Sequence, residues 1–138
     1  MSQIRDERTL AAPPELVWQA LSTADGLLGW FWSPRLDPQI EVDLRAGGRY
    51  RIASPVIGMA VSGEYTTVRP HDLLEFGWHW DGEDVTSSVT VTLTPHGDGT
   101  TLVVDHDGLA DSEVENHAKG WSDCLDRLPD WLAAHAEV

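Results

Sequence analysis

One histidine of this sequence lies where it could transfer protons. His106 follows Leu102 and Val104 at a spacing of two, so in a strand its side chain points to the same face as these apolar residues. A general acid–base pair could form between His106 and the phenol of Tyr65 or Tyr50. A lone inward histidine is, however, more often a hydrogen-bonded core residue. His106, Tyr65 and Tyr50 are therefore candidate catalytic residues, and catalysis itself stays open.

The stretch EFGWHWDGED, residues 75–84, resembles a metal-binding cluster. His79 and Asp81 share one face of an extended strand, and Glu83 and Asp84 follow them. Structural zinc needs four ligands, chiefly nitrogen or sulfur, and the chain has no second cluster at a suitable spacing. Phosphate-binding loops and dinucleotide fingerprints are also absent from the sequence. We therefore expect no metal and no cofactor, and residues 81–84 should form a polar hairpin turn.

The aromatic residues point to a ligand cavity. Seven tryptophans in 138 residues are too many for complete burial in a small domain, so some should line a cavity or its entrance. Alternation along residues 73–80 places Phe76, Trp78 and Trp80 on one inner face. The same aromatics could instead simply fill the core. The predicted ligand-binding residues are Trp30, Phe31, Trp32, Tyr50, Tyr65, Phe76, Trp78, Trp80, Val91, Val104, His106, His117 and Trp121.

Hydrophobic periodicity predicts the elements that position these side chains. A first strand over residues 3–10 is followed by a helix that begins at Pro13 and Pro14, a turn at Asp25 and Gly26, and a second short helix ending at Pro34. From residue 39 the period changes to two, typical of an antiparallel meander. Its strands are expected at 39–44, 48–54, 58–69, 73–80, 85–95 and 100–107.

The last segment should cover the buried face of this sheet. Apolar residues recur at intervals of three and four from Val114 to Leu132, which predicts one long amphipathic helix. Cys124 lies beside this stripe and is expected to be a partly buried, unreactive thiol. Pro129 should kink the helix or end its regular part near Leu128. The expected fold class is α+β: a curved, seven-stranded antiparallel sheet around a long C-terminal helix, with two short helices after the first strand.

Length and charge limit the possible functions. No linker or repeat divides the 138 residues, so we expect one domain over residues 1–138. Nine Lys and Arg against 23 Asp and Glu give a net charge of −14, which disfavours nucleic acids and anionic membrane surfaces as partners. The sequence shows no signal peptide and no apolar run of membrane-spanning length, so we expect a cytoplasmic protein. The expected oligomeric state is a monomer or a weak homodimer.

Several stretches together resemble the helix-grip fold of the START-related SRPBCC superfamily, and within it the branch of activator of heat-shock protein 90 ATPase homologues. They are APPELVWQAL (12–21), GWF (29–31), DLRAGGRYR (43–51), GEYTTVRPHDLLEFGW (63–78), GTTLVVDHDGL (99–109) and HAKGWSDCLDRL (117–128). The resemblance implies a hydrophobic cavity between the sheet and the last helix, although members of the superfamily differ widely in function. It also implies that the short helix carrying Trp30, Phe31 and Trp32 lies where such a cavity opens, which makes these residues candidates for a gate.

The preferred hypothesis is a protein that binds a small hydrophobic ligand, aromatic or polycyclic, in that cavity. Three alternatives remain open. One is an enzyme of the cyclase or hydrolase type that uses His106 with Tyr65 or Tyr50. Another is a self-resistance protein that sequesters a reactive natural product, and the last is a chaperone-associated regulatory module that acts through its acidic surface.

Overall fold

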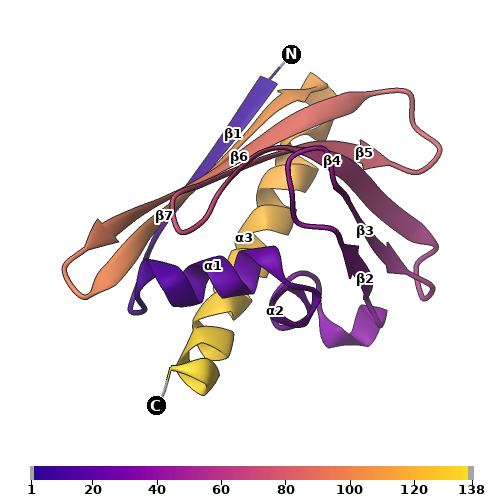
Figure 1. Cartoon of the computed structure of the whole chain (residues 1–138). Helices are drawn as coiled ribbons and strands as arrows, with labels where there is room; N and C mark the ends of the chain where they lie inside the picture. Colours follow the sequence, from indigo (N-terminus) through magenta and orange to yellow (C-terminus); the bar gives the residue numbers. More distant parts are fainter. Residues whose placement is uncertain (1, 137–138) are drawn as a thin grey trace.

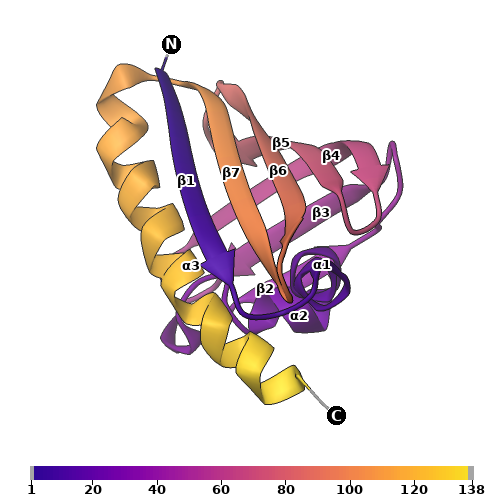
Figure 2. The ribbon, with the colours of Figure 1, turned by 90° about the vertical axis from the view of Figure 1, so that its left-hand side faces the viewer.

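Seven strands form one curved antiparallel sheet in the computed structural model, which describes residues 2–136 (Figures 1 and 2). In space the strands follow the order β1-β7-β6-β5-β4-β3-β2, so β1 closes the meander by pairing with the last strand. Their bounds are β1 Ser2–Leu10, β2 Gln39–Val42, β3 Arg49–Ser54, β4 Met59–Arg69, β5 Leu73–Trp80, β6 Thr86–His96 and β7 Gly99–Leu109. The predicted fold class is confirmed.

The helices cover the concave side of the sheet. They are α1 (Pro14–Ser22), α2 (Ala24–Leu28) and α3 (Val114–His135), with 3-10 turns η1 (Pro34–Leu36) and η2 (Asp111–Glu113). Figure 1 shows α3 crossing the concave face while α1 and α2 lie at one end of it. No helix within residues 2–136 is both long and apolar enough to span a membrane.

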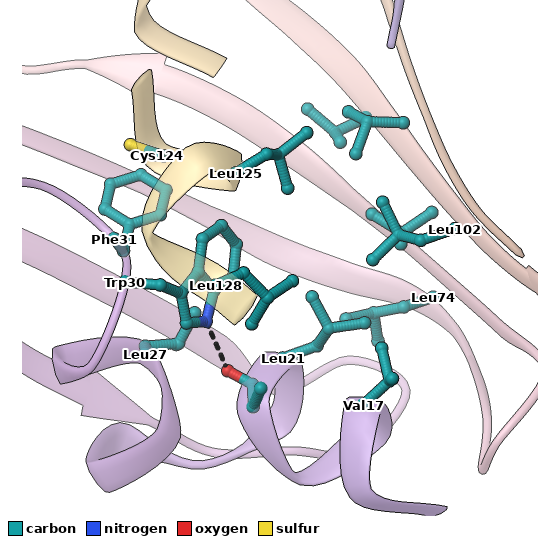
Figure 3. Packing of buried hydrophobic residues seen from close by; sticks show 14 of the residues in the cluster. Val17, Leu21, Leu27, Trp30, Phe31, Leu74, Leu102, Cys124, Leu125 and Leu128 are labelled. Carbon is teal, nitrogen blue, oxygen red and sulfur yellow. Dashed lines mark hydrogen bonds between the residues drawn. The ribbon is translucent and has the colours of Figure 1, made fainter. Parts of the chain in front are cut away.

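A buried cluster joins the sheet to all three helices. Leu102 of β7 and both Leu125 and Leu128 of α3 are fully buried, and Val17 of α1 packs in the same cluster (Figure 3). The Trp30 indole N–H donates a hydrogen bond to the carbonyl of Ala20 at 2.8 Å, which fixes the segment after α2 to the end of α1. The walls of any cavity in this interior are therefore held by core packing.

Two local predictions about the short helices were wrong. Asp25 and Gly26 lie inside α2, because Thr23 caps this helix by accepting the Gly26 N–H at 2.9 Å. The helix ends at Leu28, so Trp30, Phe31 and Trp32 lie in the turn that follows it. Trp32 has a positive φ of 64°, a conformation that a helix does not contain.

Of the two effects expected of Pro129, an end of the regular helix near Leu128 is not found. α3 continues through Pro129 to His135. Pro129 is exposed and removes one backbone donor, but Leu128 and Leu132 on either side of it are both buried against the core. This packing stabilises the helix on both sides of the proline and compensates for the missing hydrogen bond.

Candidate functional site: an aromatic cavity between the sheet and the last helix

A cavity of about 360 Å³ lies between β5, α3 and the turn after α2. Strand β5 contributes Trp78 and Trp80, and α3 contributes His117 and Trp121. Its lining residues are Phe31, Trp32, Met59, Trp78, Trp80, Glu83, Glu113, Asn116, His117, Gly120, Trp121 and Cys124. A volume of this size lies within the range of small-molecule sites.

The walls of the cavity are largely aromatic. The rings of Trp32 and Trp80 are stacked, with centroids 6.1 Å apart and planes 12° from parallel. Trp78 meets the edge of Trp80 at 5.6 Å and lies 5.4 Å from Trp121, and Phe31 packs on Trp78 at 6.0 Å. Flat ligands could therefore stack on rings that other aromatics already hold in place.

His117 is held in one tautomer by two hydrogen bonds. The Trp80 indole N–H donates to Nε2 of His117 at 3.0 Å, and an indole nitrogen can only donate. Nε2 is therefore the acceptor, and the proton on Nδ1 is donated to the backbone carbonyl of Glu113 at 2.8 Å. In this arrangement the ring is neutral and orients Trp80 in the cavity wall.

Trp78 carries a buried donor without a partner. Its Nε1–H forms no hydrogen bond to any residue of the part that the structure describes, and the side chain is only 6% exposed. Buried polar groups are nearly always paired. This N–H is closed to solvent, so it is an unsatisfied polar group within the residues that the structure describes.

A second set of predicted ligand residues surrounds a much smaller void. This void, about 30 Å³, is no larger than the space that one water molecule takes in the liquid. Six of the predicted residues border it and not the main cavity: Trp30, Tyr50, Tyr65, Phe76, Val91 and Val104. They form the packed interior behind the cavity, while Phe31, Trp78 and Trp121 border both spaces.

His106 points inward as predicted, but it does not reach the cavity. Its side chain is fully buried; the Trp121 indole N–H donates to Nδ1 at 3.0 Å, and Nε2 lies 2.7 Å from the Ser87 hydroxyl. Because Nδ1 must accept, Nε2 carries the proton and donates it to Ser87. Burial, and to a lesser degree His117, lowers the pKa of His106 to about 3. Both ring nitrogens are thus engaged within the core.

The structure does not bring His106 together with either tyrosine. The Tyr50 hydroxyl donates to the carbonyl of Gly77 at 2.7 Å, and burial raises the pKa of Tyr50 and of Tyr65 well above the ordinary phenol value. Neither phenol ionises near neutral pH, and neither is hydrogen-bonded to the histidine. The acid–base pair expected from the sequence is not assembled in this structure.

We expect Tyr50→Phe to lower the free energy of unfolding by about 1–2 kcal/mol, because the partly buried Gly77 carbonyl loses its phenol donor. Tyr65→Phe is the matched control, since it removes the same atom from a neighbouring ring of the same void, and its loss should be smaller. Urea denaturation of both variants measures the difference. Equal losses would show that the Tyr50 hydrogen bond contributes nothing specific.

Six lining residues were missed from the sequence, and four of them belong to α3 or to its N-cap. Asn116, Gly120 and Cys124 follow one another at intervals of four, and Glu113, which caps α3, precedes His117 by four residues, so one face of the helix presents them all to the cavity. That spacing was available in the sequence once His117 and Trp121 were chosen. Met59 begins β4 and Glu83 lies in the turn between β5 and β6, and only the tertiary structure places them here.

Other candidate chemistry is not assembled either. Within residues 2–136, no group of three or more His, Cys, Asp and Glu side chains is arranged to hold a metal ion. Asp81 is paired with Arg51 at 2.7 Å, and His79 contacts the backbone carbonyl of Glu83 within the turn between β5 and β6. Burial raises the pKa of the Cys124 thiol, which favours its unreactive form.

The curved antiparallel sheet, the long C-terminal helix and the cavity between them define an α+β protein with the helix-grip fold. The model of the family described as "Activator of Hsp90 ATPase homolog 1-like protein" matches residues 11–133, so the chain belongs to this family. No functionally curated protein matches the chain significantly.

Solved structures of similar proteins share the fold. Protein CV1439 from Chromobacterium violaceum is 28% identical, with 93% of this chain and 94% of that one aligned and a TM-score of 0.83. DynU16, a protein of the dynemicin biosynthetic locus, is also 28% identical, with 96% of this chain and 48% of its own length aligned at a TM-score of 0.83. CalU16 from Micromonospora echinospora is 27% identical over 95% and 76% of the two chains, with a TM-score of 0.76.

Proposed function

We propose that this protein binds a small aromatic ligand in the 360 Å³ cavity between β5 and α3. The observation that carries the proposal is the wall of stacked and edge-on rings from Trp32, Trp78, Trp80 and Trp121 around a space of ligand size. The same arrangement favours binding over catalysis, because His106 already uses both nitrogens in the core.

Gly120 offers a way to block the cavity without disturbing its rings. It lines the cavity from α3, and a Cβ added there meets no atom within 4 Å. We expect Gly120→Leu to weaken binding of N-phenyl-1-naphthylamine, a neutral fluorescent probe, by about 10-fold or more, because its side chain fills the space that the probe needs. Fluorescence titration at pH 7 measures the dissociation constants.

Gly120→Ala is the matched control. It should bind the probe within about 2-fold of wild type and be more stable by about 0.5–1 kcal/mol, since alanine is the better helix former. A second pair of variants tests whether the aromatic wall binds the probe. Trp80→Ala should weaken probe binding. Trp131→Ala, which removes a partly buried indole outside the cavity, should not. The proposal fails if wild type does not bind the probe, or if Gly120→Leu binds it as tightly as wild type does.

A narrower candidate within the same site is sequestration of a natural product. The similarity to DynU16, which comes from the dynemicin biosynthetic locus, favours it. Sequestration predicts that a natural product of this size is recovered unchanged after incubation with the protein, whereas a cyclase or hydrolase would return a product of different mass. Mass spectrometry of the extracted ligand separates the two.

A further inference from the structure

We propose that the aromatic ligand carries an ammonium group, which binds beside Trp80, Glu83 and Glu113 at one end of the cavity. This inference rests on the proposed function and names the chemical class of its ligand. A second cavity of about 60 Å³ borders the first, because Trp78, Trp80, Glu83, Glu113 and His117 line both. The ammonium group is placed at this border, and the aromatic body in the larger cavity.

The charge at this border is negative. Glu83 forms no ion pair with another described residue, and Glu113 has only His117 near it, at 3.9 Å. His117 accepts a hydrogen bond at Nε2 and is neutral in this arrangement. No lysine or arginine of residues 2–136 lines either cavity. A cation is therefore attracted here, and it meets no positive group in the wall.

The aromatic rings favour the same charge. Indole faces attract cations within about 6 Å of the ring centre, more strongly than other aromatic side chains do. Trp80 is partly exposed, lies parallel to Trp32 and is held in place by its hydrogen bond to His117. An ammonium group between the Trp80 ring and the two carboxylates would gain from both interactions while remaining partly hydrated.

The size of the smaller cavity limits the head group. A space of about 60 Å³ corresponds to about two water molecules of the liquid, which suits a primary or secondary ammonium rather than a bulky quaternary one. The net charge of −14 adds a long-range field that concentrates cations near the protein and repels anions. A carboxylate ligand would have to enter against this field and would find no cation to pair with in the wall.

The test compares three probes that differ only in their end group: 2-(2-naphthyl)ethylamine, 2-(2-naphthyl)ethanol and 3-(2-naphthyl)propanoate. The affinity of each probe is measured by its ability to displace N-phenyl-1-naphthylamine from the wild-type protein at pH 7 and low salt. We expect the amine to bind about 10-fold more tightly than the alcohol, and the propanoate more weakly than either. Raising the salt concentration should reduce the preference for the amine.

Single substitutions test which carboxylates produce the preference for the amine. Glu113→Gln and Glu83→Gln should each weaken amine binding by about 3- to 10-fold and leave alcohol binding within about 2-fold of wild type. Glu115→Gln is the matched control, because it removes the same charge from the first turn of α3 but does not line either cavity. Its amine affinity should stay within about 2-fold of wild type.

The outcomes separate this inference from the proposed function. If the amine and the alcohol bind equally, if the propanoate binds best, or if Glu115→Gln weakens amine binding as much as Glu113→Gln does, the ammonium site is overturned while aromatic binding stands. If N-phenyl-1-naphthylamine and all three probes fail to bind, both are overturned.

Discussion

His106→Ala is expected to lower the free energy of unfolding at pH 7 by about 3–5 kcal/mol. The imidazole is fully buried and bonded on both sides, to the Trp121 indole N–H and to the Ser87 hydroxyl. Removing the imidazole leaves a space in the core, and the buried Trp121 N–H loses its hydrogen-bond acceptor. Urea denaturation followed by circular dichroism measures the loss.

His106→Gln is the matched variant, because its amide can still accept from Trp121 and donate to Ser87. We expect it to recover part of the stability lost in His106→Ala. Its affinity for N-phenyl-1-naphthylamine should match that of wild type, since His106 lines neither the main cavity nor the smaller ones. A catalytic or ligand-contacting role for His106 would instead show as a change in binding at unchanged stability.

The same histidine should make the protein sensitive to acid. In the unfolded chain the imidazole has a pKa of about 6.5, whereas burial holds it near 3 in the folded protein. The stability that comes from the neutral folded form is therefore complete above pH 6.5 and is lost as the pH falls toward 3. Between pH 6 and pH 4, wild type should lose up to about 1.4 kcal/mol per pH unit more than His106→Gln does. Parallel pH profiles for the two proteins would contradict this assignment.

Gly63→Ala is expected to cost about 3–5 kcal/mol or to prevent folding. Gly63 lies in β4, and a Cβ at this position would be 2.0 Å from the backbone oxygen of Gly77 in β5 and 3.0 Å from the Tyr50 ring. The Gly77 oxygen cannot move away freely, because it also accepts the Tyr50 hydroxyl. The close approach of the two strands thus requires glycine on one side.

Gly77→Ala provides the matched control across the same contact. A Cβ at Gly77 meets nothing closer than 3.8 Å, so this variant should remain within about 0.5 kcal/mol of wild type. Soluble yield and thermal unfolding of the two variants give the comparison. If Gly63→Ala melts within a few degrees of Gly77→Ala, the steric explanation is wrong.

Much of the fold could be predicted from the sequence because it depends on periodicity. A spacing of two along β7 determines that Leu102, Val104 and His106 share the buried face, and all three are buried. A spacing of three and four along α3 determines which side of the helix packs on the sheet. These patterns are local, since successive side chains of a strand or helix take directions set by the backbone.

The candidate site was only partly predictable, because it depends on which buried side chains leave space between them. Periodicity placed Trp78, Tyr50 and His106 all inside, but could not tell a cavity wall from a filled interior or from a histidine with two partners. The two short helices were predicted, but the bounds of the second were not: the Thr23 cap decided where α2 begins, and the packing of Trp30 on α1 fixes the segment that follows it.

The sequence by itself determined the order of the elements, the inward face of each strand and the acidic charge, because each depends on the chain's own residues and their spacing. Only the tertiary structure decided that Glu83 from a hairpin and Glu113 from the turn that caps α3 border one aromatic cavity, and that His106 lies behind it. Those neighbours come from segments far apart in the chain, and their distances depend on how the sheet curves around the helix.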